Sequence, residues 1–285
     1  FEISDRITVL RDGQYVFSKK TKDLCPNDLI KAMVGREITE IYPESKSKIG
    51  EVILKVKHAS RKGEFKKIDF ELRKGEKLGI AGLMGAGRTE TTRAIFGVDP
   101  KESGEIYLDD ENITGYDIDH RANAGIGYAF QQPPRFKGMT VMKLLSLSAG
   151  KELKREECCK LLSTVGLCAN EYIEREVDGT LSGGEMKRLE IATVLAKSHK
   201  LCIFDEPEAG IDLWSFSMLI EQFEKIHKEK KESLVLISHQ ERIIQMADRI
   251  MVIEDGKIAS IGATDEILPQ LLGKTADSYS CLTCR

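Results

Sequence analysis

The stretch Lys77-Leu-Gly-Ile-Ala-Gly-Leu-Met-Gly-Ala-Gly-Arg-Thr-Glu90 joins a short apolar strand to a glycine-rich loop and the start of a helix. Its glycines have the spacing of a phosphate-binding loop, Gly-x-x-x-x-Gly-Lys-Ser/Thr, with Arg88 at the lysine position. In such a loop the backbone N–H groups and the helix N-terminus attract phosphate oxygens, and Thr89 offers a hydroxyl to Mg²⁺. Arginine keeps the charge but replaces a compact ammonium with a planar fork. Alone, the loop fits a phosphate site and a glycine-rich structural turn equally well.

Three later motifs favour the phosphate site. Leu181-Ser-Gly-Gly-Glu185 opens a helix, and its serine, backbone N–H groups and helix N-terminus make a second anion site. Leu201-Cys-Ile-Phe-Asp-Glu206 is a buried strand that ends in two carboxylates, at the strand end where α/β sheets bind ligands. Asp205 suits Mg²⁺, and Glu206 suits a general base that polarises water. Leu234-Val-Leu-Ile-Ser-His239 ends another core strand in a histidine, which is a candidate sensor of the γ-phosphate.

Strands alternate with helices around these motifs. Residues 52–56 and 65–72 have the period-two pattern of half-buried strands, whereas residues 201–204 and 234–237 are the uninterrupted apolar runs of buried parallel strands. The stretch from about 140 to 180 is largely helical in period. We therefore predict an α/β fold with a helical insertion between the glycine-rich loop and the later core strands.

A repeat links the two ends of the chain. Asp5-Arg-Ile-Thr-Val-Leu-Arg-Asp-Gly13 matches Asp248-Arg-Ile-Met-Val-Ile-Glu-Asp-Gly256 at a constant offset of 243 residues, and both predict a hairpin with an Asp-Gly turn. Two unrelated hairpins could share this pattern by chance, but a short amphipathic helix and a closing glycine also follow each copy. We interpret residues 1–35 as the remnant of a preceding copy of the same domain and residues 36–50 as the linker.

The chain has 285 residues, of which 41% are hydrophobic and 31% charged, with a net charge of −3. This is an ordinary globular composition, and its balanced charge indicates no basic surface for nucleic acid. No apolar run approaches the ~18–20 residues of a membrane span, so we expect no span within this chain and leave a membrane partner open. The seven cysteines are scattered and odd in number, which indicates reduced thiols. Cys281 and Cys284 have metal-ligand spacing, but without a second pair a frayed tail explains them better.

The order and spacing of these motifs resemble the ATP-binding cassette (ABC) ATPase family, whose signature is Leu-Ser-Gly-Gly-Glu. The resemblance covers about residues 50–275 and implies a P-loop NTPase fold of the ABC type, with an antiparallel β subdomain and a helical subdomain at about 132–195. It places the ATPase domain at 51–275 and leaves 276–285 as a C-terminal tail. ATP and Mg²⁺ are the implied cofactors.

The resemblance also assigns roles to individual residues. The Walker A loop, the signature and the D-loop would bind the nucleotide through Gly82, Gly85, Ala86, Gly87, Arg88, Thr89, Glu90, Ser182, Gly183, Gly184, Glu185 and Asp212. Mg²⁺ would be held by Thr89, Gln131 and Asp205. Glu206 would be the catalytic base, assisted by the switch histidine His239 and by Gln131 of the Q-loop. The family's adenine-stacking aromatic residue is not evident, because the alternating pattern around Phe65 favours a core position for that side chain.

Different parts of the chain resemble different branches of the family. Residues 1–100, through Met33-Val-Gly-Arg-Glu37 and the arginine-bearing loop, resemble a tandem sugar-importer ATPase at the end of its first cassette and the start of its second. Residues 110–285, through Ala129-Phe-Gln-Gln-Pro-Pro-Arg-Phe-Lys-Gly138, resemble a Suf-type iron–sulfur cluster assembly ATPase. The changeover falls near Ser103-Gly-Glu-Ile-Tyr-Leu-Asp109, a sequence common to both branches. The chain is therefore interpreted as a hybrid or misjoined sequence, or else as one divergent family.

Partners follow from the same resemblance. An ABC cassette binds MgATP between two copies, so a second cassette is expected, in a homodimer or a tandem. The sugar-importer branch implies a membrane permease subunit, and the Suf branch implies an iron–sulfur scaffold protein. Both imply a cytoplasmic location, the former at the inner face of the cell membrane. A third alternative is an ATP-binding module with little hydrolysis, which rests on Arg88, whereas Glu206 and His239 argue against it.

Overall fold

The computed structural model describes residues 4–11, 14–25, 29, 32, 49–211, 213–230 and 232–271. The contacts within the chain divide it into two compact units, Phe1–Ser45 and Lys46–Arg285. Within the described ranges, no helix combines the length and the apolar character needed to cross a membrane.

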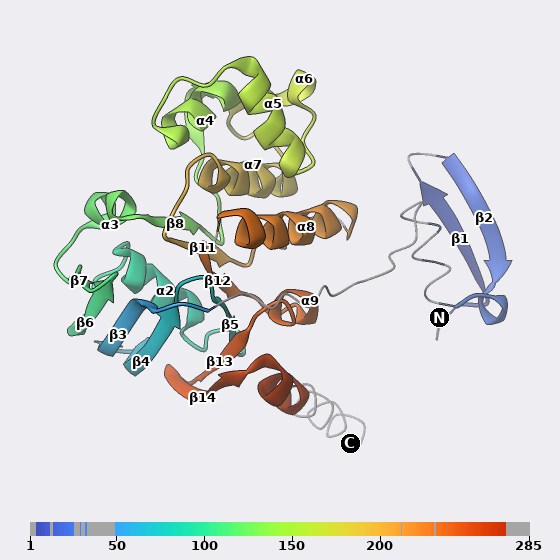
Figure 1. Ribbon diagram of the computed structural model, residues 1–285. Coiled ribbons are helices and arrows are strands. Elements are labelled where there is room, and N and C mark those ends of the chain that lie inside the picture. Colours follow the sequence, from blue (N-terminus) through green and yellow to red (C-terminus); the bar gives the residue numbers. More distant parts are fainter. Residues whose placement is uncertain are drawn as a thin grey trace. The chain divides into compact units, whose positions relative to one another are not determined.

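The larger unit is built on a six-stranded sheet of order β14-β13-β5-β12-β11-β8 (Figure 1). Its strands are β5 (Lys77–Ala81), β8 (Ile126–Ala129), β11 (Leu201–Asp205), β12 (Ser233–Ile237), β13 (Arg249–Glu254) and β14 (Lys257–Ala263). β14 runs antiparallel to β13, whereas the other neighbours are parallel, and β5, β8, β11 and β12 are buried along their whole length. This burial explains their uninterrupted apolar sequences. The carboxyl ends of β5, β12 and β11 therefore lie side by side at one edge of the sheet.

A second, antiparallel sheet has the order β4-β3-β6-β7. Its strands are β3 (Val52–Arg61), β4 (Phe65–Arg73), β6 (Ser103–Leu108) and β7 (Glu111–Asn112). The prediction ended this strand at residue 56, because the period-two pattern breaks there. β3 nevertheless continues to Arg61, with register shifts near His58, where φ is 50°. Ile68 and Leu72 of this sheet share a core with Ile95 of α2 (Arg88–Phe96) and with Ile80 of the central sheet. The antiparallel sheet thereby holds α2 against the central sheet.

The part of the chain between β8 and β12 is mainly helical, and most of its helices lie together at the top of Figure 1. They are α4 (Val141–Ala149), α5 (Arg155–Thr164), α6 (Ala169–Tyr172), α7 (Gly183–Leu195) and α8 (Leu213–Lys230), with the paired short strands β9 (Phe136–Thr140) and β10 (Glu176–Val177) among them. Leu145, Ile173 and Leu189 of this region pack in one core with Phe204 of β11. Two further helices, α3 (Ile118–Ala124) and α9 (Glu241–Ile244), lie elsewhere in the unit. The predicted α/β fold with an antiparallel sheet and a helical region is confirmed.

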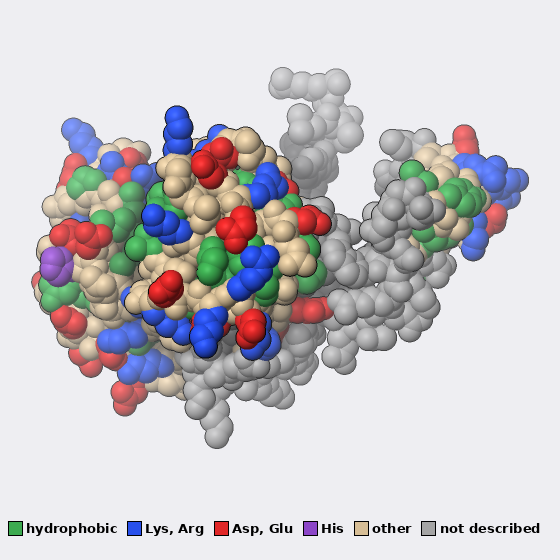
Figure 2. Space-filling model, turned by 90° about the horizontal axis from the view of Figure 1, so that it is seen from above, with side chains coloured by type: hydrophobic (Ala, Val, Ile, Leu, Met, Phe, Trp, Pro, Cys, Tyr) green, Lys and Arg blue, Asp and Glu red, His purple; other side chains and the backbone are tan. Residues whose placement is uncertain are grey.

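Charges of both signs are mixed on the surface of the larger unit. Figure 2 shows the face seen from above Figure 1, where Lys and Arg side chains alternate with Asp and Glu. This mixture agrees with the near balance of 43 basic and 46 acidic residues in the sequence. Neither sign dominates that face.

The smaller unit contains a hairpin with the same strand pairing as the last hairpin of the larger unit. β1 (Arg6–Arg11) pairs antiparallel with β2 (Gln14–Lys20), and the 3-10 turn η1 (Thr21–Asp23) follows. Every residue pair of this hairpin has a counterpart 243 residues later in β13–β14. Even the register shift recurs, between Val9 and Leu10 in one hairpin and between Val252 and Ile253 in the other. The predicted repeat therefore extends to the backbone pairing.

The threonine that follows each hairpin makes the same two hydrogen bonds. Thr21 donates from Oγ1 to the carbonyl of Ser4 at 2.6 Å and from its N–H to the carbonyl of Asp5 at 3.0 Å. Thr264 donates from Oγ1 to the carbonyl of Ala247 at 2.6 Å and from its N–H to that of Asp248 at 3.2 Å. The turn residues of the first hairpin, 12–13, and most of the helix predicted at 28–34 lie outside the described residues.

Candidate functional site

The glycine-rich loop leaves β5 at the carboxyl edge of the sheet and enters α2. Gly82 has a φ of 155°, and a Cβ there would lie 2.3 Å from the carbonyl oxygen of Ile253. Gly87 caps α2 with a φ of 94°, and its Cβ would lie 2.7 Å from the carbonyl oxygen of Glu64. Only glycine fits either position. Gly85 and Ala86 belong to the same loop, and Glu90 lies in the first turn of α2. The predicted phosphate-loop residues thus form a loop that leads directly into the N-terminus of α2.

Thr89 and Asp205 meet beside this loop. The Thr89 hydroxyl donates to Oδ1 of Asp205 at 3.2 Å, and the Tyr128 hydroxyl donates to Oδ2 at 3.2 Å. Asp205 is fully buried, and this burial raises the pKa of its carboxyl group above the ordinary value. The carboxylate therefore has two neutral donors in a site that disfavours its negative charge.

Three predicted residues converge on Glu206, which follows Asp205 directly. Gln131 Nε2 donates to Oε2 of Glu206 at 2.9 Å. Arg88 Nη2 and His239 Nδ1 each lie 3.6 Å from Oε1. Glu206 has a φ of 44°, an uncommon value for a residue with a side chain, and its N–H donates to the carbonyl of Ile237 at 2.9 Å. Backbone strain of this kind concentrates at functional sites.

The signature begins α7, away from the glycine-rich loop in the sequence. Ser182 is the N-cap and accepts a hydrogen bond from the N–H of Glu185, whose carboxylate accepts one from the N–H of Ser182. A hydrogen bond from the Tyr172 hydroxyl is the main reason that the pKa of Glu185 falls to about 2. A Cβ on Gly184 would lie 2.3 Å from the carbonyl oxygen of Gly210, so the signature packs against the D-loop of the same chain. Within the described residues, the side chains of the signature thus bond within α7 and to Tyr172.

Sequence reasoning missed two buried residues of α7 that hold the backbone next to Gln131. Lys187 donates from Nζ to the carbonyl of Phe130 and to that of Asp205, the latter at 2.8 Å. Glu190 accepts from the N–H of Phe130 at 2.7 Å, and its carboxylate lies 3.6 Å from Lys187. Burial is the main cause that raises the pKa of Glu190 to about 7 and that lowers the pKa of Lys187. The sequence feature that could have revealed Lys187 and Glu190 is a pair of opposite charges three residues apart among the apolar residues of α7.

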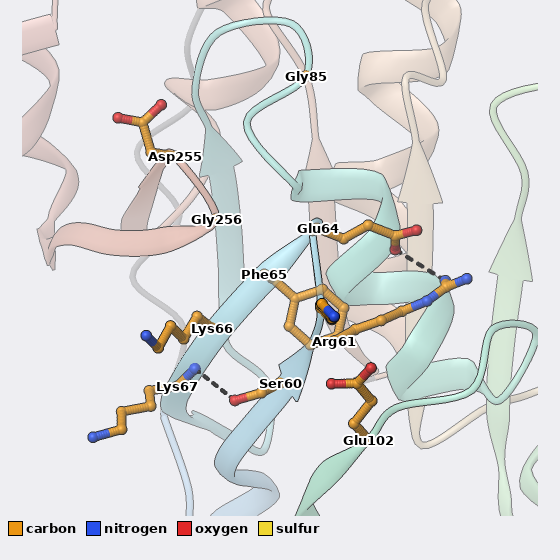
Figure 3. A pocket seen from close by; sticks show the side chains of 12 residues that line it. Ser60, Arg61, Glu64, Phe65, Lys66, Lys67, Gly85, Glu102, Asp255 and Gly256 are labelled. Carbon is orange, nitrogen blue, oxygen red and sulfur yellow. Dashed lines mark hydrogen bonds and ion pairs between the residues drawn. The ribbon is translucent and has the colours of Figure 1, made fainter.

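A pocket of about 670 Å³ adjoins the loop at the β3–β4 hairpin (Figure 3). It is lined by the backbone of Gly85 and by the side chains of Arg61, Glu64 and Lys66, among others, and Arg61 and Glu64 form an ion pair of 2.9 Å. Phe65 is only 3% exposed, so it belongs to the core, as its pattern predicted. Among the described residues that line this pocket, Phe65 is the only aromatic one, so the pocket offers no other candidate for an adenine-stacking ring.

Some predicted residues lie outside the part of the chain that the structure describes. They are Asp212 of the D-loop, most of the proposed linker at 36–50, and the tail with Cys281 and Cys284. The structure brings the remaining predicted residues into two groups, one around Asp205 and Glu206 and one at the start of α7.

Sequence comparison assigns the fold to a known family. The family described as "ABC transporter" matches residues 65–209, just over half of the chain. The chain belongs to the ABC transporter family. Ribose import ATP-binding proteins of Bacillus cereus and Rubrobacter xylanophilus are 32% and 34% identical to this ABC cassette, each over 93% of this chain and 56% of the relative. The chain thus spans about half the length of the curated relatives it matches.

Solved structures of ABC cassettes share the fold. A dimeric ATP-binding cassette in a post-hydrolysis state, bound to ADP and Pi, aligns with a TM-score of 0.67 at 21% identity, over 74% of this chain and 99% of that one. A Clostridium perfringens component of an ABC transporter complex aligns with a TM-score of 0.63 at 24% identity, over 77% and 91%. At these identities the likeness establishes the fold of the cassette.

These comparisons do not support the Suf-type interpretation of residues 110–285. The matches to the ribose import proteins of Bacillus cereus and Clostridium tetani extend over 93% and 98% of the chain and so continue through the supposed changeover near residues 103–109. The similarity to ribose import proteins therefore gives no support to a change of branch within the chain. The iron–sulfur scaffold protein, which was expected from the Suf-type interpretation, is likewise not supported.

Proposed function

We propose that this ABC cassette binds and hydrolyses ATP to drive a partner. The convergence of Gln131, Arg88 and His239 on Glu206, next to the Thr89–Asp205 pair, carries the proposal. Bound phosphates would lie against the loop amides and the N-terminus of α2. Glu206 would orient and deprotonate the attacking water, while Gln131 and His239 hold its carboxylate. A positioned base of this kind contributes about 10²–10⁴-fold to a rate.

The residues around Asp205 fit a magnesium ion. Its buried carboxylate has only hydroxyl donors on the described side chains, and the raised pKa reports that a positive charge would be favoured there. Thr89, Asp205 and the carbonyl oxygen of the Gln131 amide would be its ligands, because Mg²⁺ prefers oxygen donors. When bound, the ion offsets the negative charge of the transferring phosphate.

A second cassette would complete each site. The capping box of the signature engages the N–H groups of Ser182 and Glu185, and the N–H groups of Gly183 and Gly184 between them would bind a phosphate on another copy. The cassette would then hydrolyse ATP only when two copies close, so that closure and hydrolysis are coupled. The dimeric cassette with ADP and Pi, named above for its fold, supports this arrangement by analogy.

The coupled process that we propose is import of a sugar of the ribose class. The support is the identity of 32% to 34% with ribose import ATP-binding proteins. The partner would be a membrane permease, and the chain would work at the inner face of the cell membrane. Ribose-stimulated ATP hydrolysis by the chain reconstituted with its permease in vesicles would test this; unchanged hydrolysis would refute it.

We also propose that residues 1–35 belong to the end of a preceding cassette. The support is the shared register and the matching bonds of Thr21 and Thr264. The remaining parts would be a linker at 36–50, the ATPase domain at 51–275 with its helical subdomain at about 132–195, and a tail at 276–285. The preceding cassette would then be the natural partner in a tandem.

A second candidate is an ATP-binding module with little hydrolysis. Arg88 favours it, because a guanidinium that pairs with Glu206 leaves the proposed base engaged. Phosphate release from MgATP by the purified chain distinguishes the two candidates. Hydrolysis that Glu206→Gln abolishes, while the exposed-site control Glu152→Gln preserves it, supports the ATPase. Equal rates in Glu206→Gln and the unaltered chain would exclude Glu206 as the base.

A further inference from the structure

Glu208 is a buried acid beside His239 with no assigned role. It lies two residues after Glu206 and is only 8% exposed. Oε1 accepts a hydrogen bond from the Ser238 hydroxyl, whereas Oε2 is buried and has no hydrogen-bond partner among the described residues. Burial raises the pKa of the Glu208 carboxyl group. Of its two carboxyl oxygens, Oε1 is thus the one that is hydrogen-bonded among the described residues, and its partner is Ser238.

The hydrogen bonds around Ser238 fix the backbone on both sides of His239. The Ser238 hydroxyl accepts from the N–H of Gln240 at 2.8 Å, so its own proton is available to Glu208. The Ser238 N–H donates to the carbonyl of Ile80 at 3.4 Å, and its carbonyl accepts from Arg88 at 3.4 Å. All the polar groups of Ser238 are thus engaged, and Glu208 is the partner that turns its hydroxyl.

One ring nitrogen of His239, Nδ1, faces the carboxyl groups of both Glu206 and Glu208. Nδ1 lies 3.6 Å from Oε1 of Glu206 and 3.8 Å from Oε1 of Glu208. In this orientation of the ring, the nearby Glu206 carboxylate favours a proton on Nδ1 and so selects one tautomer of the neutral ring. The other nitrogen, Nε2, then has the opposite hydrogen-bonding role.

We propose that Glu208 is a positioning residue, which holds the turn at Ser238 so that Nδ1 of His239 faces Glu206. This inference rests on the proposed ATPase function, because it gives His239 and Glu206 their setting. It needs only the acceptor oxygen at Oε1, and an amide can supply that oxygen. Glu208→Gln should therefore retain the arrangement, and Glu208→Ala should lose it.

The test measures the kcat and KM of MgATP hydrolysis, together with the tautomer of His239. The tautomer comes from ¹⁵N–¹H long-range correlation spectra of the full chain labelled at histidine, assigned with His239→Gln. We expect Glu208→Ala to lower kcat by about 10- to 100-fold with KM within about twofold, since small misplacements of reacting groups cost this much. The same variant should lose the predominance of the Nδ1–H form, while Glu208→Gln keeps kcat within about threefold and keeps the tautomer.

Ser238→Ala provides a second route if Glu208→Ala does not fold. It removes only the hydroxyl and should reproduce the loss in kcat, and combining it with Glu208→Gln should cost nothing more. An unchanged His239 tautomer and kcat in Glu208→Ala or Ser238→Ala would overturn the inference, as would a Glu208→Gln variant as impaired as Glu208→Ala. Absence of hydrolysis by the unaltered chain would refute the proposed ATPase instead, and the tautomer would still decide the role of Glu208.

Discussion

The guanidinium of Arg88 lies 3.6 Å from the carboxylate of Glu206, Nη2 to Oε1, and both side chains are largely buried. Arg88 also donates to the carbonyl of Ser238 at 3.4 Å. The residue in the lysine position of the phosphate loop therefore touches the proposed base and the turn that carries His239. Binding a phosphate would make the guanidinium exchange these contacts for new ones.

This relationship predicts that Arg88→Lys raises kcat more than it tightens ATP binding. A lysine ammonium lacks the fork that joins Glu206 and Ser238, and it can follow the charge that develops on the phosphoryl group. We expect kcat to rise on the order of threefold with little change in the Kd of a fluorescent ATP analogue. Arg88→Met is the control for loss of charge and should weaken ATP binding. A lower or unchanged kcat in Arg88→Lys would show that the loop is adapted to arginine.

A two-copy site predicts that two inactive variants complement each other. Gly183→Asp should block the signature, because it places a negative charge where phosphate would bind, and a Cβ at Gly183 meets no atom within 4 Å. Glu206→Gln should block the base. In an equimolar mixture half of the dimers are mixed and carry one intact site, so activity should recover to about a quarter of the unaltered value if the two sites act independently.

Gly183→Ala is the matched control and should remain active, because it adds a side chain of small size without charge. A mixture as inactive as its components would argue that each chain supplies both halves of its own site. Gly184 is unsuitable for this experiment, since its Cβ would clash with the carbonyl of Gly210.

Local patterns sufficed for the strands and loops that carry the proposed chemistry. β5 covers the short apolar strand predicted before the glycine-rich loop, and β11 and β12 each extend by one residue beyond the predicted runs. The uninterrupted apolar runs of buried parallel strands made these predictions possible. The glycine spacing located the turn before α2, because Gly82, Gly85 and Gly87 all have positive φ values, which is a property of the local backbone. Such signals need no knowledge of the tertiary structure.

Contacts between distant segments could not be predicted in this way. Lys187 reaches Phe130 across 57 residues, and Glu208 reaches Ser238 across 30. A charged residue in a helix is normally a solvated one, and only burial shows that Lys187 serves a backbone carbonyl instead. The resemblance to a Suf-type ATPase is not supported for a related reason, since a few short motifs carry less information than similarity along the whole chain.

The repeated hairpin predicts different effects for two equivalent threonines. Thr264→Ala removes the bond to Ala247 within the cassette and should lower its free energy of unfolding by about 1 kcal/mol. Thr21→Ala removes the equivalent bond to Ser4 and should leave the cassette unchanged, if residues 1–35 belong to a preceding domain. Urea denaturation of both variants, and of the chain without residues 1–35, checks this. Loss of ATP binding or of folding on that deletion would contradict the domain assignment.

Glu190 predicts a pH dependence of stability. Its pKa is about 7 in the folded chain and about 4.3 in an unfolded one, so the folded state binds more protons between these values. Its contribution is therefore fully present at low pH and is lost as pH rises through the folded pKa, by an amount on the order of 2–3 kcal/mol between pH 5 and pH 8. Glu190→Gln keeps an oxygen for the N–H of Phe130 but cannot titrate. The free energy of unfolding of this variant in urea should hence fall less steeply over this pH range than that of the unaltered chain, and the difference in slope isolates Glu190 from other buried acids.

Glu152→Gln, at an exposed position, is the control and should keep the slope of the unaltered chain. Parallel pH profiles for Glu190→Gln and the unaltered chain would mean that Glu190 stays ionised beside Lys187 throughout.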